Sequence, residues 1–137
     1  MTVAYVDANV LLRFLVGDPP EMAGKATVLM QSVERGETTL VVDDIIVAEV
    51  VWVLSSFYRH KAQEISTTLL ELLSQDGIEV DDAVLSALAL YGNKGVDFVD
   101  ALLATRMQRR GAGRVFSFDR HFDRISGIER LEPGVPV

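Results

Sequence analysis

The sequence predicts an α/β fold, a three-layer α/β/α sandwich with a mainly parallel central sheet. Short apolar runs rich in β-branched residues alternate with longer amphipathic segments, an order typical of strands and helices in a parallel sheet. The turns between these segments are short and carry Gly, Pro and Asp. A chain of 137 residues suits a single domain over residues 1–137, and no repeat, low-complexity segment or linker divides it.

The boundaries of these elements follow from capping and helix-breaking residues. Gly17 ends the first helix, and the second is expected to start with Asp18 as its cap and Pro19 at the first helical position. Asp43 or Asp44 caps the third helix. Strands are expected over residues 3–6, 40–42, 78–80, 114–117 and 128–131, and helices over 9–16, 19–36, 45–58, 60–75, 83–91 and from 97 onward.

The composition excludes several kinds of site. The chain has no cysteine, so it forms no disulfide and no thiolate metal site, which fits a reducing cytosol. Its longest apolar run, residues 45–54, is interrupted by Glu49 and is shorter than the roughly 20 residues that span a bilayer. No secretory signal pattern precedes the first strand. We therefore expect a soluble, cytoplasmic protein without membrane segments.

The charge is unevenly distributed. A net charge of −7 argues against a broad positive surface for nucleic acid. Arginines nevertheless gather between residues 106 and 124, whereas residues 75–82 are acidic. By default these arginines form an exposed helix face; if they lie near a catalytic site, they can guide a phosphate backbone.

An acid follows the first predicted strand. Asp7 stands where the apolar run of residues 3–6 passes directly into a helical pattern. The carboxyl edge of a parallel sheet is where ligands bind, so Asp7 is a candidate metal ligand or general base. The alternative is an N-cap for the following helix. Asp119 repeats the arrangement after the strand at 114–117, with Asp123 four residues later.

A single charge interrupts the third helix, which is apolar almost all round and is expected to be a core helix. Glu49 is that charge, and burying a carboxylate without a partner costs several kcal/mol. We therefore expect a metal or another partner beside Glu49. The alternative places Glu49 on a narrow exposed stripe or in a pair with an arginine.

Two acids open the sixth helix. Asp97 suits the N-cap position, and Asp100 lies in the first turn, facing the small residues Ala101 and Ala104. The positive end of the helix dipole favours both acids for structural reasons alone. Asp100 is the better functional candidate, because the small neighbours leave its carboxylate room to reach a ligand.

A parallel sheet can bring these carboxylates to one edge. Asp7, Glu49, Asp100 and Asp119 would repel one another there unless cations are bound or some of the acids are protonated. Oxygen ligands without Cys or clustered His favour Mg²⁺ or Mn²⁺ over zinc. Such a site suits the attack of water on a phosphodiester. Asn9 and Ser117 can orient a metal-binding carboxylate, or a metal-bound water, without binding the metal themselves.

Four segments together resemble the motifs of PIN-domain nucleases, and most closely those of the VapC toxins of type II toxin–antitoxin pairs. They are VDANVLLR at residues 6–13, the lone Glu49, FVDALLA at residues 98–104 and SFDRHF at residues 117–122. The resemblance covers essentially the whole chain. It implies an α/β/α sandwich, a Mg²⁺- or Mn²⁺-dependent endoribonuclease, a homodimer and neutralisation by a VapB-type antitoxin.

The resemblance also assigns roles to individual residues. It places the four acids of the family on Asp7, Glu49, Asp100 and Asp119, as metal ligands and catalytic residues. Asn9 and Ser117 fall on the polar positions that support the first and the fourth acid. The remaining acids of these segments, Asp97 and Asp123, are possible auxiliary ligands, and His121 stands where the family commonly has an acid.

Three functions are consistent with these residues. The leading hypothesis is an endoribonuclease toxin. A second is a catalytically silent module that keeps the fold and acts by binding a protein. A third is a PIN-type nuclease that acts in RNA maturation or on DNA. The RNA target is not encoded by any motif, because single-stranded RNA is recognised through loop shape and unpaired bases.

Overall fold

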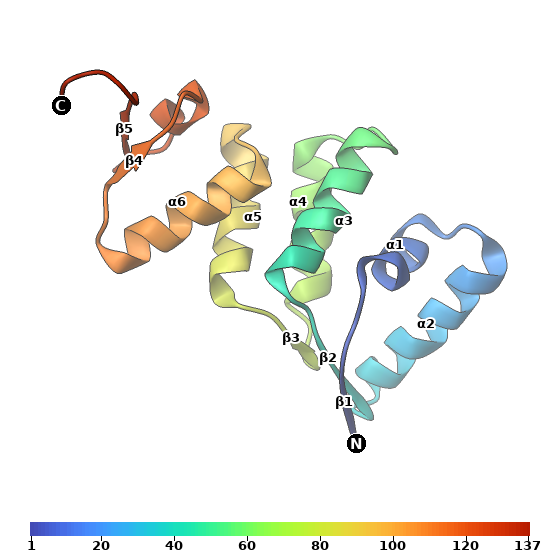
Figure 1. The fold of residues 1–137 in the computed structure, drawn as a ribbon. Coiled ribbons are helices and arrows are strands. Elements are labelled where there is room, and N and C mark those ends of the chain that lie inside the picture. Colours follow the sequence, from blue (N-terminus) through green and yellow to red (C-terminus); the bar gives the residue numbers. More distant parts are fainter.

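The computed structural model describes residues 1–137 and has the predicted α/β composition (Figure 1). The strands are β1 (Thr2–Tyr5), β2 (Thr38–Val41), β3 (Ile78–Glu79), β4 (Arg114–Phe116) and β5 (Glu129–Leu131). The helices are α1 (Ala8–Val16), α2 (Pro20–Glu34), α3 (Asp44–Ser56), α4 (Ala62–Leu73), α5 (Asp82–Lys94) and α6 (Phe98–Arg110), with a 3-10 helix η1 (Arg120–Arg124) between β4 and β5. Each predicted helix is present, with ends that shift by a few residues.

Aspartates cap four of the helices, as their positions predict. Asp7, Asp43, Asp81 and Asp97 each accept a hydrogen bond from a backbone N–H at the start of the helix that follows. The predicted start of α2 is wrong by one residue. Pro19, not Asp18, occupies the cap position, and Pro20 is the first helical residue, where a missing N–H is tolerated.

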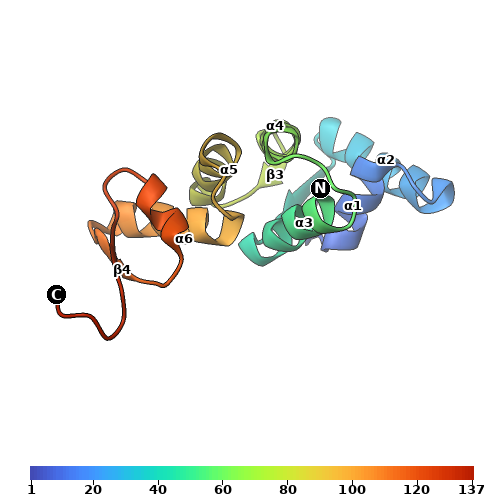
Figure 2. The same cartoon turned by 90° about the horizontal axis from the view of Figure 1, so that it is seen from above.

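The strands are parallel, and they form two separate sheets. One sheet has the order β1-β2-β3, and the other contains only β4 and β5. The expected parallel sheet would bring the ends of β1 and β4 to one edge. Instead, β4 and β5 lie at the far end of α6, away from β1, in both views (Figures 1 and 2).

The main core joins the three-stranded sheet to the helices. Leu40 of β2, Val50 of α3, Leu69 of α4 and Leu88 of α5 are all buried within it. The first turn of α6 also belongs to this core, through Phe98. Because α6 is held at its start by the main core, its direction decides where β4 and β5 lie.

A second, smaller core carries the C-terminal part of the chain. This core contains Phe122, Ile125 and Ile128 of the C-terminal part. They pack against Val96, which precedes α6, and against Ala104 within α6. We call β4, η1 and β5, residues 114–131, the C-terminal unit. This unit therefore packs on α6 and not on the three-stranded sheet. No helix of the structure has the length and apolar character needed to cross a bilayer.

Candidate functional site

Asp7 lies at the junction of β1 and α1, where the sequence places it. Its Oδ1 accepts a hydrogen bond from the Val10 N–H at 3.1 Å, so the N-cap interpretation is confirmed. The side chain is exposed and borders an open hollow lined also by Tyr5, Asp43 and Ile45. One carboxylate oxygen is used by the cap, and the other remains available to a ligand on the solvent side.

Glu49 is exposed on the outer face of α3, so the expectation of a buried charge is wrong. This face also carries Ile45 and Trp52, both mostly exposed, which explains why the helix looks apolar all round in sequence. Val47 and Val50 on the opposite face are buried. Glu49 forms no ion pair within 4.0 Å, and in water it needs none. Its carboxylate is thus free to bind a ligand from solvent.

Asp100 and Asp119 are brought together from different elements. Asp100 is in the first turn of α6, and Asp119 caps η1 just after β4. Burial raises the pKa of Asp100, and the neighbouring charges of Asp119 and Asp97 and a hydrogen bond with Asp119 raise it further. A hydrogen bond from the His121 backbone N–H, at 2.8 Å, lowers the pKa of Asp119. Of the two acids, Asp100 therefore holds a proton more readily than Asp119 does.

Ser117 supports this pair by shaping the turn before Asp119. Its Oγ accepts a hydrogen bond from the Asp119 backbone N–H at 2.9 Å. The backbone of Ser117 is tied in turn, because its N–H donates to the Leu131 carbonyl and its carbonyl accepts from Arg130. Ser117 thus positions Asp119 through the main chain, and a hydroxyl two residues before an acid is the signal that identified it.

The other candidate residues have structural partners or stand apart. Asp97 accepts from the N–H of Phe98 at 3.0 Å, and Asp123 forms an ion pair with Arg130 at 3.2 Å. Asn9 is exposed and lines a groove between α1 and α2, and no hydrogen bond joins it to Asp7. The proposed support of Asp7 by Asn9 is thus not formed in this arrangement.

The four principal acids fall into two groups. Asp7 and Glu49 belong to the part built on the three-stranded sheet, and Asp100 and Asp119 to α6 and the C-terminal unit. Mg²⁺ and Mn²⁺ prefer oxygen ligands, so the carboxylates of Asp100 and Asp119 are the right type of donor for either cation. No three acidic or histidine side chains are close enough together to hold one ion.

Two of the three arginines of α6, Arg106 and Arg109, form ion pairs with acids at the starts of other helices. Arg106 contacts Asp44 at 2.7 Å and Asp81 at 3.0 Å, which joins α6 to the starts of α3 and α5. Arg109 contacts Asp82 at 3.1 Å. Sequence reasoning missed this network. The only signal for this network in the sequence is that α3 and α5 begin with acids and α6 ends with arginines.

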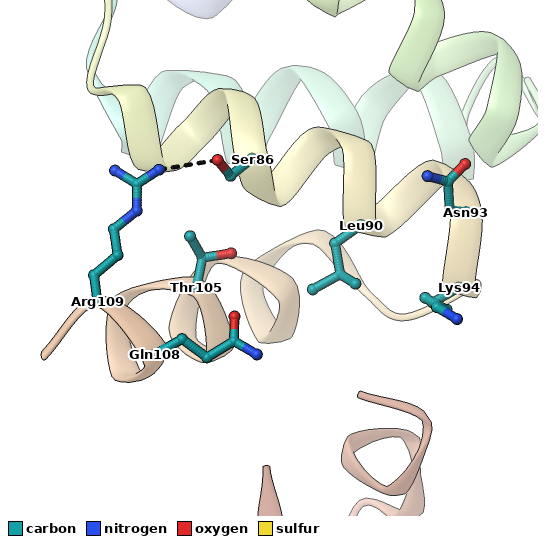
Figure 3. A pocket seen from close by; sticks show the side chains of 7 residues that line it. All are labelled: Ser86, Leu90, Asn93, Lys94, Thr105, Gln108 and Arg109. Atoms are coloured by element: carbon teal, nitrogen blue, oxygen red, sulfur yellow. Dashed lines mark hydrogen bonds between the residues drawn. The ribbon is translucent and has the colours of Figure 1, made fainter. Parts of the chain in front are cut away.

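An open polar hollow of about 460 Å³ lies between α5 and α6 (Figure 3). Ser86 and Lys94 of α5 face Gln108 and Arg109 of α6 across it, and Arg109 donates a hydrogen bond to Ser86. None of the four principal acids lines this hollow. It is therefore separate from the candidate metal centre.

Comparison with known proteins identifies the family of this chain. The family model described as PIN domain matches residues 4–128, which is most of the chain. The chain belongs to the PIN-domain family. It is also 25% identical over 130 residues to a VapC ribonuclease of Aquifex aeolicus (strain VF5), an alignment that covers 93% of this chain and 95% of that protein.

The match to the PIN domain extends over both groups of acids. Its range begins inside β1, before Asp7, and ends after η1, beyond Asp119. The matched range therefore includes both parts of this structure, although their strands are not hydrogen-bonded to each other.

Proposed function

We propose that this PIN-domain protein is a divalent-metal-dependent endoribonuclease and the toxin of a type II toxin–antitoxin pair. The observation that carries the proposal is the close Asp100–Asp119 pair, with opposite pKa shifts, in a chain whose residues 4–128 match the PIN domain. The similarity to a VapC ribonuclease supports RNA as the substrate and a VapB-type antitoxin as the partner. A cytoplasmic homodimer is part of the same proposal.

Asp7, Glu49, Asp100 and Asp119 would hold Mg²⁺ or Mn²⁺, with Asp97 and Asp123 as auxiliary groups. A bound divalent cation supplies Lewis-acid stabilisation of the charge that develops on the phosphate. Asp119 is held in place by the backbone N–H of His121 and by the turn that Ser117 fixes. The pKa of Asp100 is raised by burial and by the neighbouring acids, and a bound cation would favour its ionised form.

The test is RNA cleavage by the purified chain with Mg²⁺, with Mn²⁺ and with EDTA. We expect cleavage with either metal, none in EDTA, and a loss of at least about a hundredfold in Asp100→Asn, a size typical when a group that acts only in the transition state is removed. Asp76→Asn, which removes an exposed acid before β3, is the matched control and should keep wild-type activity.

Full cleavage in EDTA, or an active Asp100→Asn, would contradict the proposal. The same assay with single-stranded DNA separates an RNA nuclease from a DNA-processing enzyme. The separation of the acids in this structure is the observation that favours a silent protein-binding module. That alternative predicts metal-independent binding of a protein partner and no turnover on any nucleic acid.

A further inference from the structure

The outer face of α3 carries a row of exposed side chains. Ile45, Glu49 and Trp52 follow one another at intervals of four and three residues, so they share one face of the helix, and all three are exposed. Ile45 is 71% exposed and Trp52 66%. Val47 and Val50 belong instead to the main core, where α3 contacts α1 and α4 (Figure 1). Large apolar side chains that adjoin one another in water mark an interaction site.

The row starts at the hollow that borders Asp7. Ile45 lines this hollow together with Asp7 and Asp43. Glu49 is one turn further along α3, and Trp52 is one turn beyond Glu49. Side chains three or four residues apart on a helix have Cβ atoms about 5–6 Å from each other. A phosphodiester that reaches Asp7 and Glu49 therefore lies close to the indole of Trp52.

Glu49 decides which kind of ligand suits this row. It stands between the two apolar side chains and forms no ion pair within 4.0 Å. A protein surface that covered the whole row would bury this carboxylate without a partner, and charged residues are depleted in the cores of protein interfaces for this reason. A nucleic acid strand suits both kinds of side chain, because a base can stack on the indole while the phosphate approaches the acid through a cation.

Free cations follow the far end of the row. Arg59 and Lys61 are exposed, and neither forms an ion pair within 4.0 Å. This segment stays beside the last turn of α3, because the His60 N–H donates to the Leu54 carbonyl at 2.9 Å. In a chain with a net charge of −7, two unpaired cations at one place suit a polyanion. The outer face of α3 thus leads from the acids past an aromatic ring to free cations.

We propose that Trp52 stacks on an unpaired base of the RNA strand, next to the phosphodiester that is cleaved, and that Arg59 and Lys61 contact phosphates beyond this base. Bases within a duplex are not free to stack on a side chain, so Trp52 selects for an unpaired base at this position. Stacking tolerates every base, so Trp52 does not choose the sequence that is cut. This inference rests on the proposed function for the identity of the acids and of the substrate.

The fluorescence of Trp52 reports on this contact directly, because the chain contains a single tryptophan. Asp100→Asn, chosen to prevent cleavage, is titrated with an unstructured single-stranded RNA oligonucleotide in the presence of Mg²⁺. We expect saturable quenching of the indole emission. Inorganic polyphosphate, which has the charge of RNA but no bases, and a fully paired RNA duplex should leave the emission nearly unchanged. Equal quenching by polyphosphate, or no quenching by an RNA that the wild type cleaves, would overturn the proposal.

Cleavage kinetics measure what the stacked base contributes. Trp52→Ala should raise the KM for single-stranded RNA at least about fivefold, with a smaller change in kcat and almost none in melting temperature. Trp52→Phe keeps an aromatic ring and should lose less. Phe57→Ala is the matched control, since Phe57 is also exposed but lies five residues from Trp52, on another side of the helix, and its KM should equal that of the wild type. An unchanged KM in Trp52→Ala would contradict the stacking.

A dilution series of the wild type without RNA separates base stacking from self-association. A second copy of the chain seated on this face would bury the indole and move its emission to shorter wavelength as the protein concentration rises. We expect the emission maximum to stay constant, and a shift that RNA does not reverse would assign the face to self-association and overturn the proposal. A wild type that cleaves no RNA would instead overturn the proposed function, and the RNA and polyphosphate titrations would still decide whether Trp52 binds an unpaired base.

Discussion

The carboxyl groups of Asp100 and Asp119 lie close enough for each to shift the pKa of the other, although Asp100 is in α6 and Asp119 caps η1. Their pKa values are shifted in opposite directions. Burial and the charge of Asp119 raise the pKa of Asp100, whereas backbone hydrogen bonding lowers the pKa of Asp119. Environments that separate the pKa values of neighbouring acids are typical of sites in which one group holds a proton and the other does not.

The raised pKa of Asp100 predicts a pH-dependent gain in stability from Asp100→Asn. The folded state binds the Asp100 proton more tightly than the unfolded state does. The wild-type protein therefore loses stability as the pH rises from the ordinary aspartate pKa, about 3.9, through the raised pKa. Asp100→Asn removes this loss, so its melting temperature in EDTA should exceed that of the wild type at pH 7. The difference should shrink toward pH 3.

Asp119→Asn provides the control of opposite sign. The lowered pKa of Asp119 contributes stability that is present above the ordinary aspartate pKa and is lost as the pH falls through the lowered pKa. We therefore expect Asp119→Asn to melt below the wild type at pH 7 and to approach it in acid. Equal shifts of the same sign in both variants would contradict the paired arrangement.

Asp7 combines two roles that different substitutions separate. Asn is as good an N-cap as Asp, so Asp7→Asn should change the free energy of unfolding by less than about 0.5 kcal/mol. Asp7→Ala removes the cap of α1 and should lower it by about 1 kcal/mol. Both variants should fail to cleave RNA. Urea unfolding and the cleavage assay measure the two roles, and an active Asp7→Asn would restrict Asp7 to its role as a cap.

The helices could be predicted from sequence because their ends depend on neighbouring residues. Asp43, Asp81 and Asp97 cap helices within three residues of where they stand. Local signals also predict Asp100 and Asp119 as site residues, through a short acid beside small residues and an acid that ends a strand. These features follow from backbone geometry over one turn, which the sequence encodes directly.

The pairing of the strands and the exposure of Glu49 could not be predicted in this way. Nothing in residues 114–116 specifies which strand lies beside them, because that depends on the direction of α6 and on the ion pairs of Arg106. The prediction that Glu49 is buried is wrong because Ile45 and Trp52, on the same face of α3, are large and apolar yet exposed. Periodicity indicates burial only when the apolar side chains of a helix all face the core.

The ion pairs of Arg106 predict a modest and salt-dependent contribution to stability. Arg106→Met should lower the free energy of unfolding by about 0.5–1 kcal/mol at low salt, since all three side chains are partly exposed. The effect should fall toward zero near 1 M salt, where the Debye length is about 3 Å. A double-mutant cycle with Asp44→Asn isolates the coupling of that pair. Arg110→Met, at an exposed position without an ion pair, is the matched control.

Two glycines in helices predict opposite effects of the same substitution. A Cβ at Gly92 of α5 would lie 2.6 Å from Cβ and Oγ of Ser66, a buried residue of α4 whose Oγ donates to the Leu88 carbonyl at 2.7 Å. Gly92→Ala should therefore destabilise the protein by about 1–3 kcal/mol, because the two helices must move apart. A Cβ at Gly24 of α2 meets nothing within 4 Å. Gly24→Ala should stabilise the protein by about 0.5–1 kcal/mol through helix propensity alone.

Thermal and urea unfolding of both alanine variants measure this difference. The close approach of α4 and α5 also predicts that Ser66→Gly, introduced together with Gly92→Ala, recovers part of the loss, because it removes the atoms that the new Cβ would meet. The single variant Ser66→Gly should itself be destabilising, since it loses the hydrogen bond to Leu88 and places glycine inside a helix. Purely additive effects of the two substitutions would contradict the close contact between Gly92 and Ser66, because contacting residues couple energetically.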